Sequence, residues 1–341
     1  MRQFAFRNGL RGLALFIAAI PLGLGVCIAE AGGSRIFDNI FVMAIENHNF
    51  EDALDAELSP FLLDLSRGQG LATHYSEVTH SSLPNPLAML GGDEFGIRDD
   101  ARSCFASDFS PLQSCSHIEG DSLVDQLETA GLTIALYAET LPSAGSLTQA
   151  SPPCRIALYA QKHNPFAYFD QIAKNPARLE KPKPLEALSA DLSGKAPNFA
   201  FIVPNLRHDG HCALNCIGSA RLAQDFDDFV KRTIGAIRAS PNWTPNSAIV
   251  VTFDEGESRD APKSAASHVG AYDGDRVATI VVTNCRAPAT NDTPLNHYSL
   301  LATIEDGFRL PRLRKALGAP TLMNLFDRTC RRPRAKVLRK H

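Results

Sequence analysis

A short polar stretch, residues 80–86 (His-Ser-Ser-Leu-Pro-Asn-Pro), carries two serine hydroxyls immediately before an apolar run and a Gly-Gly-Asp sequence. The Pro-Asn turn and the apolar run predict a short helix, and the unpaired N–H groups at the start of a helix bind anions. A hydroxyl at this position is therefore a candidate nucleophile toward a bound anion. The same pattern is typical of an ordinary helix start capped by serine, so the choice depends on residues elsewhere in the chain.

Carboxylate, amide and imidazole side chains follow three apolar runs elsewhere in the chain. They are Glu46 and Asn47, then His208, Asp209 and His211, and then Asp254 and Glu255. Like charges that are brought together repel one another unless a cation neutralises them. These segments therefore predict a metal site if they meet in the fold. Oxygen ligands suit Ca²⁺, Mg²⁺ or Mn²⁺, whereas histidines shift the preference toward zinc, so the identity of the ion stays open.

The apolar runs themselves predict the elements that would bring these side chains together. The pattern predicts strands at residues 35–45, 132–137, 199–203, 247–253 and 277–283, and helices at 120–130 and 219–239. Strands this apolar, separated by helices, are typical of an α/β fold with a mainly parallel sheet buried on both faces. Ligands of such sheets collect at the carboxyl ends of the strands, which is where the polar segments lie.

The beginning of the sequence has the pattern of an export signal. Residues 1–11 carry arginines and no acid, residues 12–28 are almost wholly apolar, and small residues flank Glu30, so residues 1–31 are predicted to be a signal peptide. The apolar part is short for a stable membrane span, which needs about 20 residues. A lipid anchor at Cys27 is the alternative. The protein is therefore expected to be periplasmic or secreted.

The cysteines agree with an oxidising compartment. After Cys27 seven remain, and they are Cys104, Cys115, Cys154, Cys212, Cys216, Cys285 and Cys330. Their spacing is not that of a zinc site, and disulfides are the default outside the cytoplasm. The pairs Cys104 with Cys115 and Cys212 with Cys216 are the local candidates, each closing a loop.

Length and charge limit the remaining possibilities. Residues 32–330 suffice for one large α/β domain, and the basic tail 331–341 is expected to be a solvated terminus. The formal net charge of −3 does not indicate a polyanionic partner, so no nucleic acid is expected.

Five motifs in register resemble the phosphoesterase family, which contains secreted acid phosphatases and bacterial phospholipases C within the alkaline-phosphatase-like superfamily. The motifs are Glu-Asn-His-Asn-Phe at 46–50, residues 80–85, Lys-His-Asn-Pro-Phe at 162–166, Val-Thr-Phe-Asp-Glu-Gly at 251–256, and Asn-His-Tyr-Ser-Leu-Leu at 296–301. The resemblance runs from about residue 39 to residue 317. It implies a three-layer alkaline-phosphatase-like sandwich with a mainly parallel central sheet, and a single phosphoesterase catalytic domain over residues 32–330.

The resemblance also implies roles for individual residues. Glu46 with Asn47 and Asp254 with Glu255 match the metal-binding pairs of the family, and Ser82 matches the residue that attacks phosphorus, with Ser81 one position away. Candidate acid–base residues are Asp209, His211 and His268, and candidate substrate-binding residues are His80, Asn85, His208 and His297. His297 is also considered, with His211 and His268, for protonating the leaving group. By its local sequence His163 is typical of a turn that feeds an aromatic cluster, although the family motif places it near the site.

The expected function is hydrolysis of phosphoric esters with a divalent metal ion, through a phosphoserine on Ser82. The chain ends shortly after the last motif, so the acid-phosphatase branch and small phosphomonoesters are expected first. A phospholipase C-like phosphodiesterase or a phosphoinositide phosphatase, with a phospholipid headgroup as substrate, is the alternative. A phosphate-binding protein without turnover is the alternative of another class.

Overall fold

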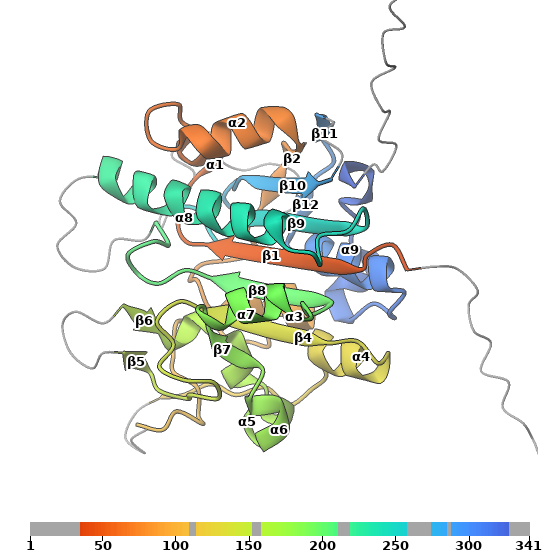
Figure 1. Cartoon of the computed structure of the whole chain (residues 1–341). Coiled ribbons are helices and arrows are strands. Elements are labelled where there is room, and N and C mark those ends of the chain that lie inside the picture. Colours follow the sequence, from red (N-terminus) through yellow and green to blue (C-terminus); the bar gives the residue numbers. More distant parts are fainter. Residues whose placement is uncertain are drawn as a thin grey trace, which may run out of the picture. The chain divides into compact units, whose positions relative to one another are not determined.

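The computed structural model describes residues 35–108, 114–151, 158–210, 219–257, 274–284 and 288–326 (Figure 1). The centre of this part of the chain is an eight-stranded sheet with the order β11-β2-β10-β9-β1-β8-β4-β7. In that order the strands are Ala289–Asn291, Gly70–Ala72, Thr279–Thr283, Ser247–Phe253, Asn39–Ile45, Phe199–Val203, Ile134–Ala138 and Pro182–Pro184. Only β10 pairs antiparallel among these strands. The predicted α/β fold with a mainly parallel sheet is confirmed.

The long apolar strands lie in the middle of the sheet. Every residue of β1, β4, β8, β9 and β10 is buried, because helices cover both faces of a parallel sheet. Each buried Val, Leu, Ile or Phe side chain contributes about 1.5–3 kcal/mol to this core. The predicted strands agree with the structure within a few residues, whereas β2, β7 and β11 were not predicted since each has only three residues.

Two groups of helices form the outer layers. Helix α8 (Ser219–Ala239) contacts both α2 (Pro60–Gly68) and α7 (Ala187–Ser193). Helix α3 (Pro84–Gly91) contacts both α4 (Leu123–Thr129) and α9 (His297–Phe308). In Figure 1 α8 and α7 cross the near face of the sheet, and α3 and α9 lie behind it. The three-layer sandwich is therefore as predicted.

Smaller elements connect these layers. Two-stranded sheets pair β3 (Tyr75–Ser76) with β12 (Leu295–Asn296), and β5 (Ala150–Ser151) with β6 (Tyr159–Ala160). The short helices are α1 (Phe50–Ala53), α5 (Asp170–Ala173) and α6 (Pro176–Leu179). The 3₁₀ helices are Gln161–His163, Pro165–Tyr168, Arg314–Gly318 and Met323–Leu325.

Helix α3 follows Ser82 directly and is fixed at both ends. Pro84 suits the first helical position because its missing N–H would have no partner there. Gly92 ends the helix with φ +72°, and its N–H donates to the carbonyl of Ala88. A Cβ at Gly92 would lie 2.7 Å from the carbonyl oxygen of Leu313, so only glycine fits this end of the helix.

Two further predictions concern export. Cys104 and Cys115 form a disulfide, as their spacing predicted, whereas Cys212 and Cys216 lie outside the described residues. None of the helices in the described ranges combines the length and the apolar character that a membrane crossing requires. The predicted signal peptide and the basic tail lie outside the described residues as well.

Helix α9 contains a carboxyl group whose ionisation opposes folding. Glu305 is 0% exposed, and burial raises its pKa to about 8, although the N–H of Leu313 donates to Oε1. A pKa raised above the ordinary 4.5 means that the folded state holds the proton more tightly than the unfolded state. The stability that this group supports is complete below pH 4.5 and is lost as the pH rises through about 8.

We therefore expect Glu305→Gln to stabilise the protein at alkaline pH. The amide keeps the shape of the side chain and cannot ionise, so at pH 9 the free energy of unfolding should exceed that of the wild type by on the order of 3 kcal/mol. At pH 4 the two proteins should be nearly equal. Denaturant titrations at both pH values measure this, with the exposed Glu57→Gln as the control. An equal difference at both pH values would contradict the assignment.

Candidate active site

The carboxyl ends of β1 and β9 meet at one edge of the sheet. The register pairs Ile45 with Phe253, so Glu46 and Asp254 follow at the same level. The N–H of Asp254 donates to the carbonyl of Ile45 at 2.8 Å, and the N–H of Glu46 donates to the carbonyl of Asp209 at 2.8 Å. The loop after β8 therefore joins the two strand ends, and the predicted convergence of polar segments at this edge is present.

Ser82 lies among charged groups at this edge. The side chain is 2% exposed, and Oγ lies 2.6 Å from Glu255 Oε1 and 3.2 Å from Glu46 Oε2. The Nζ of Lys162 donates to Oγ at 2.9 Å. The hydroxyl proton thus faces two carboxylates, while the oxygen accepts a hydrogen bond from a cation. Such an environment can activate a hydroxyl as a nucleophile.

Asn85 shapes the loop that carries Ser82. Its Oδ1 accepts from the N–H groups of Val78 and Thr79, and its Nδ2 donates to the carbonyls of Thr79 and Ser81. The side chain is 0% exposed. In the structure the amide of Asn85 is enclosed and makes its hydrogen bonds to the backbone, and its predicted substrate contact stays a prediction.

Lys162 was not predicted as a site residue. It comes from the 3₁₀ helix Gln161–His163, and its Nζ also donates to Glu46 Oε2 at 2.7 Å. Burial alone would lower the pKa of Lys162, but the carboxylates of Glu46, Asp100 and Asp254 outweigh it and raise the pKa. The side chain is therefore a cation at neutral pH. The signal in the sequence was a lysine next to histidine inside the motif at 162–166.

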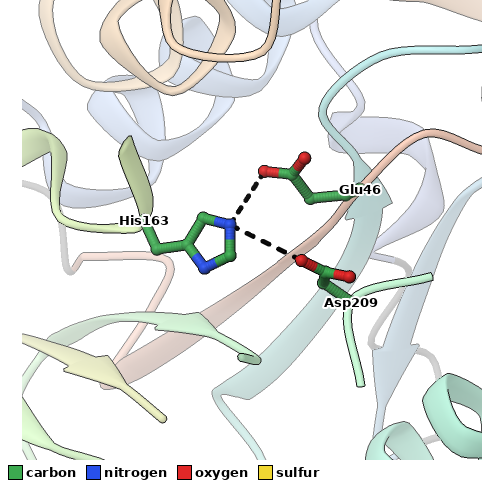
Figure 2. A group of neighbouring side chains, drawn as sticks. All are labelled: Glu46, His163 and Asp209. Atoms are coloured by element: carbon green, nitrogen blue, oxygen red, sulfur yellow. Dashed lines mark hydrogen bonds and ion pairs between the residues drawn. The ribbon is translucent and has the colours of Figure 1, made fainter. Parts of the chain in front are cut away.

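His163 lies beside Lys162 and belongs to the site. Figure 2 shows its imidazole pointing at Glu46 and Asp209, with Nε2 3.0 Å from Glu46 Oε1 and 3.6 Å from Asp209 Oδ2. These three buried residues can each offer one ligand atom to a metal ion. The ring of His163 thus faces two carboxylates of the site, in line with the place that the family motif gives it, although its local sequence favoured a structural turn.

A second group lies on the other side of Glu255. His80 contacts Glu255 Oε2 through Nδ1 and Glu77 Oε1 through Nε2 at 3.0 Å, with Asp275 Oδ2 at 3.5 Å. Burial would lower the pKa of His80, but Asp275 and Glu255 outweigh it and raise the pKa to about 10. Both ring nitrogens of His80 thus face carboxylates, and its predicted contact with substrate stays a prediction.

His297 lies against the end of β9. Its Nε2 lies 2.6 Å from the carbonyl oxygen of Asp254, and its Nδ1 lies 3.1 Å from the hydroxyl of Tyr75. The ring is 0% exposed, and burial lowers its pKa to about 4. The enclosed imidazole contacts the residue that follows β9, and its predicted roles toward substrate and leaving group stay predictions.

The other predicted histidines lie away from these contacts or outside the described residues. His208 pairs through Nδ1 with Glu139 at 2.8 Å and stacks on Phe229. His211 and His268 lie outside the described residues, so their predicted roles stay predictions.

Carboxylates gather at the ends of β1 and β9. Glu46, Asp254 and Glu255 supply carboxylate oxygens, and the amide of Asn47 donates to Glu255 Oε1 at 3.0 Å. Burial, and then the charges of Glu46 and Glu255, raise the pKa of Asp254 well above its ordinary value. A bound cation would relieve this repulsion. Of the four predicted ligands, Glu46 belongs to a group able to hold an ion, with His163 and Asp209, and the other three stay predictions. A small cavity lined by Glu46, Lys162, His163 and Asp254 adjoins these groups.

The three-layer sandwich with its mainly parallel sheet is a fold that solved structures share. A protein of that superfamily from Vibrio parahaemolyticus has a similar structure, with a TM-score of 0.54, 12% identity, and coverage of 83% of this chain and 70% of that one. At this identity the likeness concerns the fold. The model of the phosphoesterase family matches residues 37–311, and the chain belongs to that family.

Two curated relatives indicate the range of the family. The chain is 28% identical over 313 residues to a probable acid phosphatase of Kluyveromyces lactis, covering 90% of this chain and 66% of the relative. The chain thus spans just under two thirds of that relative. It is 26% identical over 320 residues to the phosphatidylinositol-3-phosphatase of Mycobacterium tuberculosis, covering 92% of this chain and 90% of the relative.

Proposed function

We propose that this protein is a metal-dependent phosphoric ester hydrolase that acts on phosphomonoesters through a phosphoserine at Ser82. One observation carries the proposal: Ser82 Oγ lies between the carboxylates of Glu255 and Glu46 and the ammonium of Lys162. Membership of the phosphoesterase family and the acid phosphatases among its relatives support the reaction class.

In the first step, the transfer of the phosphoryl group to Ser82, each residue of the site has its own role. Glu255 accepts the hydroxyl hydrogen bond of Ser82, so the oxygen can attack phosphorus as its proton leaves. The new bond joins Oγ to phosphorus, and the bond to the leaving alkoxide breaks on the opposite side. Lys162 offsets the negative charge near Oγ. Glu46, Asn47, Asp254 and Glu255 would hold the divalent ion, which would supply further positive charge next to the serine.

The second step returns the enzyme to its starting state. Water attacks the phosphoserine, phosphate leaves, and Ser82 regains its proton. Asp209 and His163 pair next to Glu46 and are the described groups best placed to hold a proton near that water. His211 and His268 remain the candidates for protonating the alkoxide, since His297 is enclosed.

A phosphoinositide monoester is the second candidate substrate. It is favoured by the mycobacterial phosphatidylinositol-3-phosphatase, because this chain covers 90% of that relative. The phospholipase C-like phosphodiesterase stays the further alternative, and a phosphate-binding protein without turnover is the alternative of another class. The acidic pairs and Ser82 are all present, which argues against lost turnover.

An oxidising location belongs to the proposal. The disulfide between Cys104 and Cys115 supports a periplasmic or secreted protein, because disulfides persist in such compartments.

The test compares monoester and diester hydrolysis. The purified protein, supplied with divalent ions in turn, should hydrolyse p-nitrophenyl phosphate at least about tenfold faster, in kcat/KM, than bis(p-nitrophenyl) phosphate. A soluble phosphoinositide monoester, assayed by phosphate release, tests the second candidate. Preference for the diester would support the phospholipase C-like alternative, and binding of phosphate without any hydrolysis would support the binding protein.

A further inference from the structure

The carboxylate of Asp100 lies beside Ser82 and contacts a backbone N–H and a lysine ammonium. Asp100 Oδ1 accepts from the backbone N–H of Leu83 at 2.9 Å, and Asp100 Oδ2 lies 3.7 Å from Lys162 Nζ. Leu83 follows Ser82 in the chain, and Lys162 donates to Ser82 Oγ. Asp100 therefore lies between a backbone donor and a cation that flank the proposed nucleophile.

The same two donors suit the oxygens of a phosphoryl group. A phosphorus atom attacked by Ser82 must come within bonding distance of Oγ, so its other oxygens lie among the groups that surround Oγ. The N–H of Leu83 lies at the start of α3, where backbone donors bind anions, and Lys162 adds a full charge. A carboxylate resembles a phosphoryl group in carrying negative oxygens with similar preferences for such donors.

Asp100 is placed so that it can leave these donors. Its side chain is 39% exposed, and the adjacent Asp99 is exposed as well. Three residues further on, Ser103 is fully buried and anchored, with its N–H donating to Gln161 and its hydroxyl to the carbonyl of Ala167. The segment is thus fixed next to the disulfide at Cys104, while the carboxylate reaches into the site from its exposed part.

We propose that Asp100 sets the affinity of the active site for phosphoryl oxygens, because its carboxylate occupies their donors and every phosphorylated ligand must displace it. This inference rests on the proposed function for the position of the phosphoryl group at Ser82. It assigns Asp100 a role in specificity: ligands with strongly negative phosphoryl oxygens displace the carboxylate, and weakly charged ligands do not. It also keeps the product, inorganic phosphate, from binding too tightly.

A positioning role for Asp100 makes the opposite prediction. If the carboxylate served only to hold Lys162 in place, its removal would free the ammonium and weaken the binding of phosphate. The two roles therefore differ in the sign of one measured quantity, the dissociation constant of phosphate.

The experiment titrates inorganic phosphate calorimetrically into the metal-loaded full chain. Asp100→Asn keeps an oxygen for the N–H of Leu83 but removes the charge, and Asp100→Ala removes both. We expect both variants to bind phosphate about three- to tenfold more tightly than the wild type, since a partly exposed ion pair and a charge-assisted hydrogen bond are lost as competitors. Inhibition by phosphate should strengthen by the same factor.

Asp99→Asn is the matched control, because it removes the same charge one residue away and its Oδ1 accepts from the nearby N–H of Ala101. Its dissociation constant for phosphate should stay within about twofold of the wild type. If Asp100→Asn binds phosphate as tightly as the wild type or more weakly, the inference is overturned. It is also overturned if neither the wild type nor the variants bind phosphate. If phosphate binds more tightly to the variants but no ester is hydrolysed, the inference stands and the proposed function fails.

Discussion

Ser82→Ala should abolish turnover while leaving the fold and the metal site intact. The hydroxyl oxygen is the only atom that the substitution removes, and with it goes the covalent path through phosphoserine. We expect kcat for p-nitrophenyl phosphate to fall by at least about 10³-fold. The carboxylates of Glu46 and Glu255 remain, so the metal content measured by mass spectrometry should stay close to that of the wild type.

Ser81→Ala is the matched control for this result. Ser81 is the neighbouring hydroxyl, and the contact that the structure shows for it is through its carbonyl oxygen, which accepts from Asn85. This variant should keep most of the wild-type kcat. Acid quenching during turnover, followed by mass spectrometry of the peptides, should place the phosphate on Ser82. Full activity in Ser82→Ala, or a phosphate on Ser81, would contradict the assignment of Ser82 as the nucleophile.

The convergence of the strand ends could be predicted because it depends on local patterns. The apolar runs of β1 and β9 fix where each strand stops, and parallel pairing then brings Glu46 and Asp254 to the same edge. Helix α8 was predicted from its amphipathic pattern, with the bounds that the structure has, Ser219–Ala239. Neither prediction needed knowledge of a distant loop.

The remaining site residues depend on how loops cross the edge of the sheet. Lys162 and Ser82 are separated by 80 residues and meet only because a 3₁₀ turn packs over the strand ends. The orientations of the His80 and His297 rings could not be predicted either. Residue type and motif suggested that both face a substrate, but burial and neighbouring oxygens, which a sequence does not specify, direct them to Glu255 and to the backbone of Asp254.

Removal of the divalent ion should have the second large effect. Dialysis against a chelator should lower kcat/KM for p-nitrophenyl phosphate by at least about 100-fold, and one of Ca²⁺, Mg²⁺, Mn²⁺ or Zn²⁺ should restore it. The physical reason is the crowding of Glu46, Asp254 and Glu255: burial, and then the charges of the other two carboxylates, raise the pKa of Asp254. A raised pKa means that protons compete with the metal. The apparent metal affinity should therefore weaken as the pH falls, and a metal titration at pH 5 and pH 7 measures this.

Two substitutions separate this site from other acidic groups. Asp254→Asn keeps the shape of the side chain but removes one ligand charge, so it should need a higher metal concentration for half-maximal activity. Glu119→Gln is the matched control, because Glu119 belongs to an exposed group with His117 and Asp170 that is also able to offer ligand atoms. If the ion acts at Ser82, the metal concentration for half-maximal activity should be the same in Glu119→Gln as in the wild type. Activity that survives the chelator, together with a wild-type metal requirement in Asp254→Asn, would show that the carboxylates at the strand ends neutralise Lys162 and the neighbouring histidines instead of a metal ion.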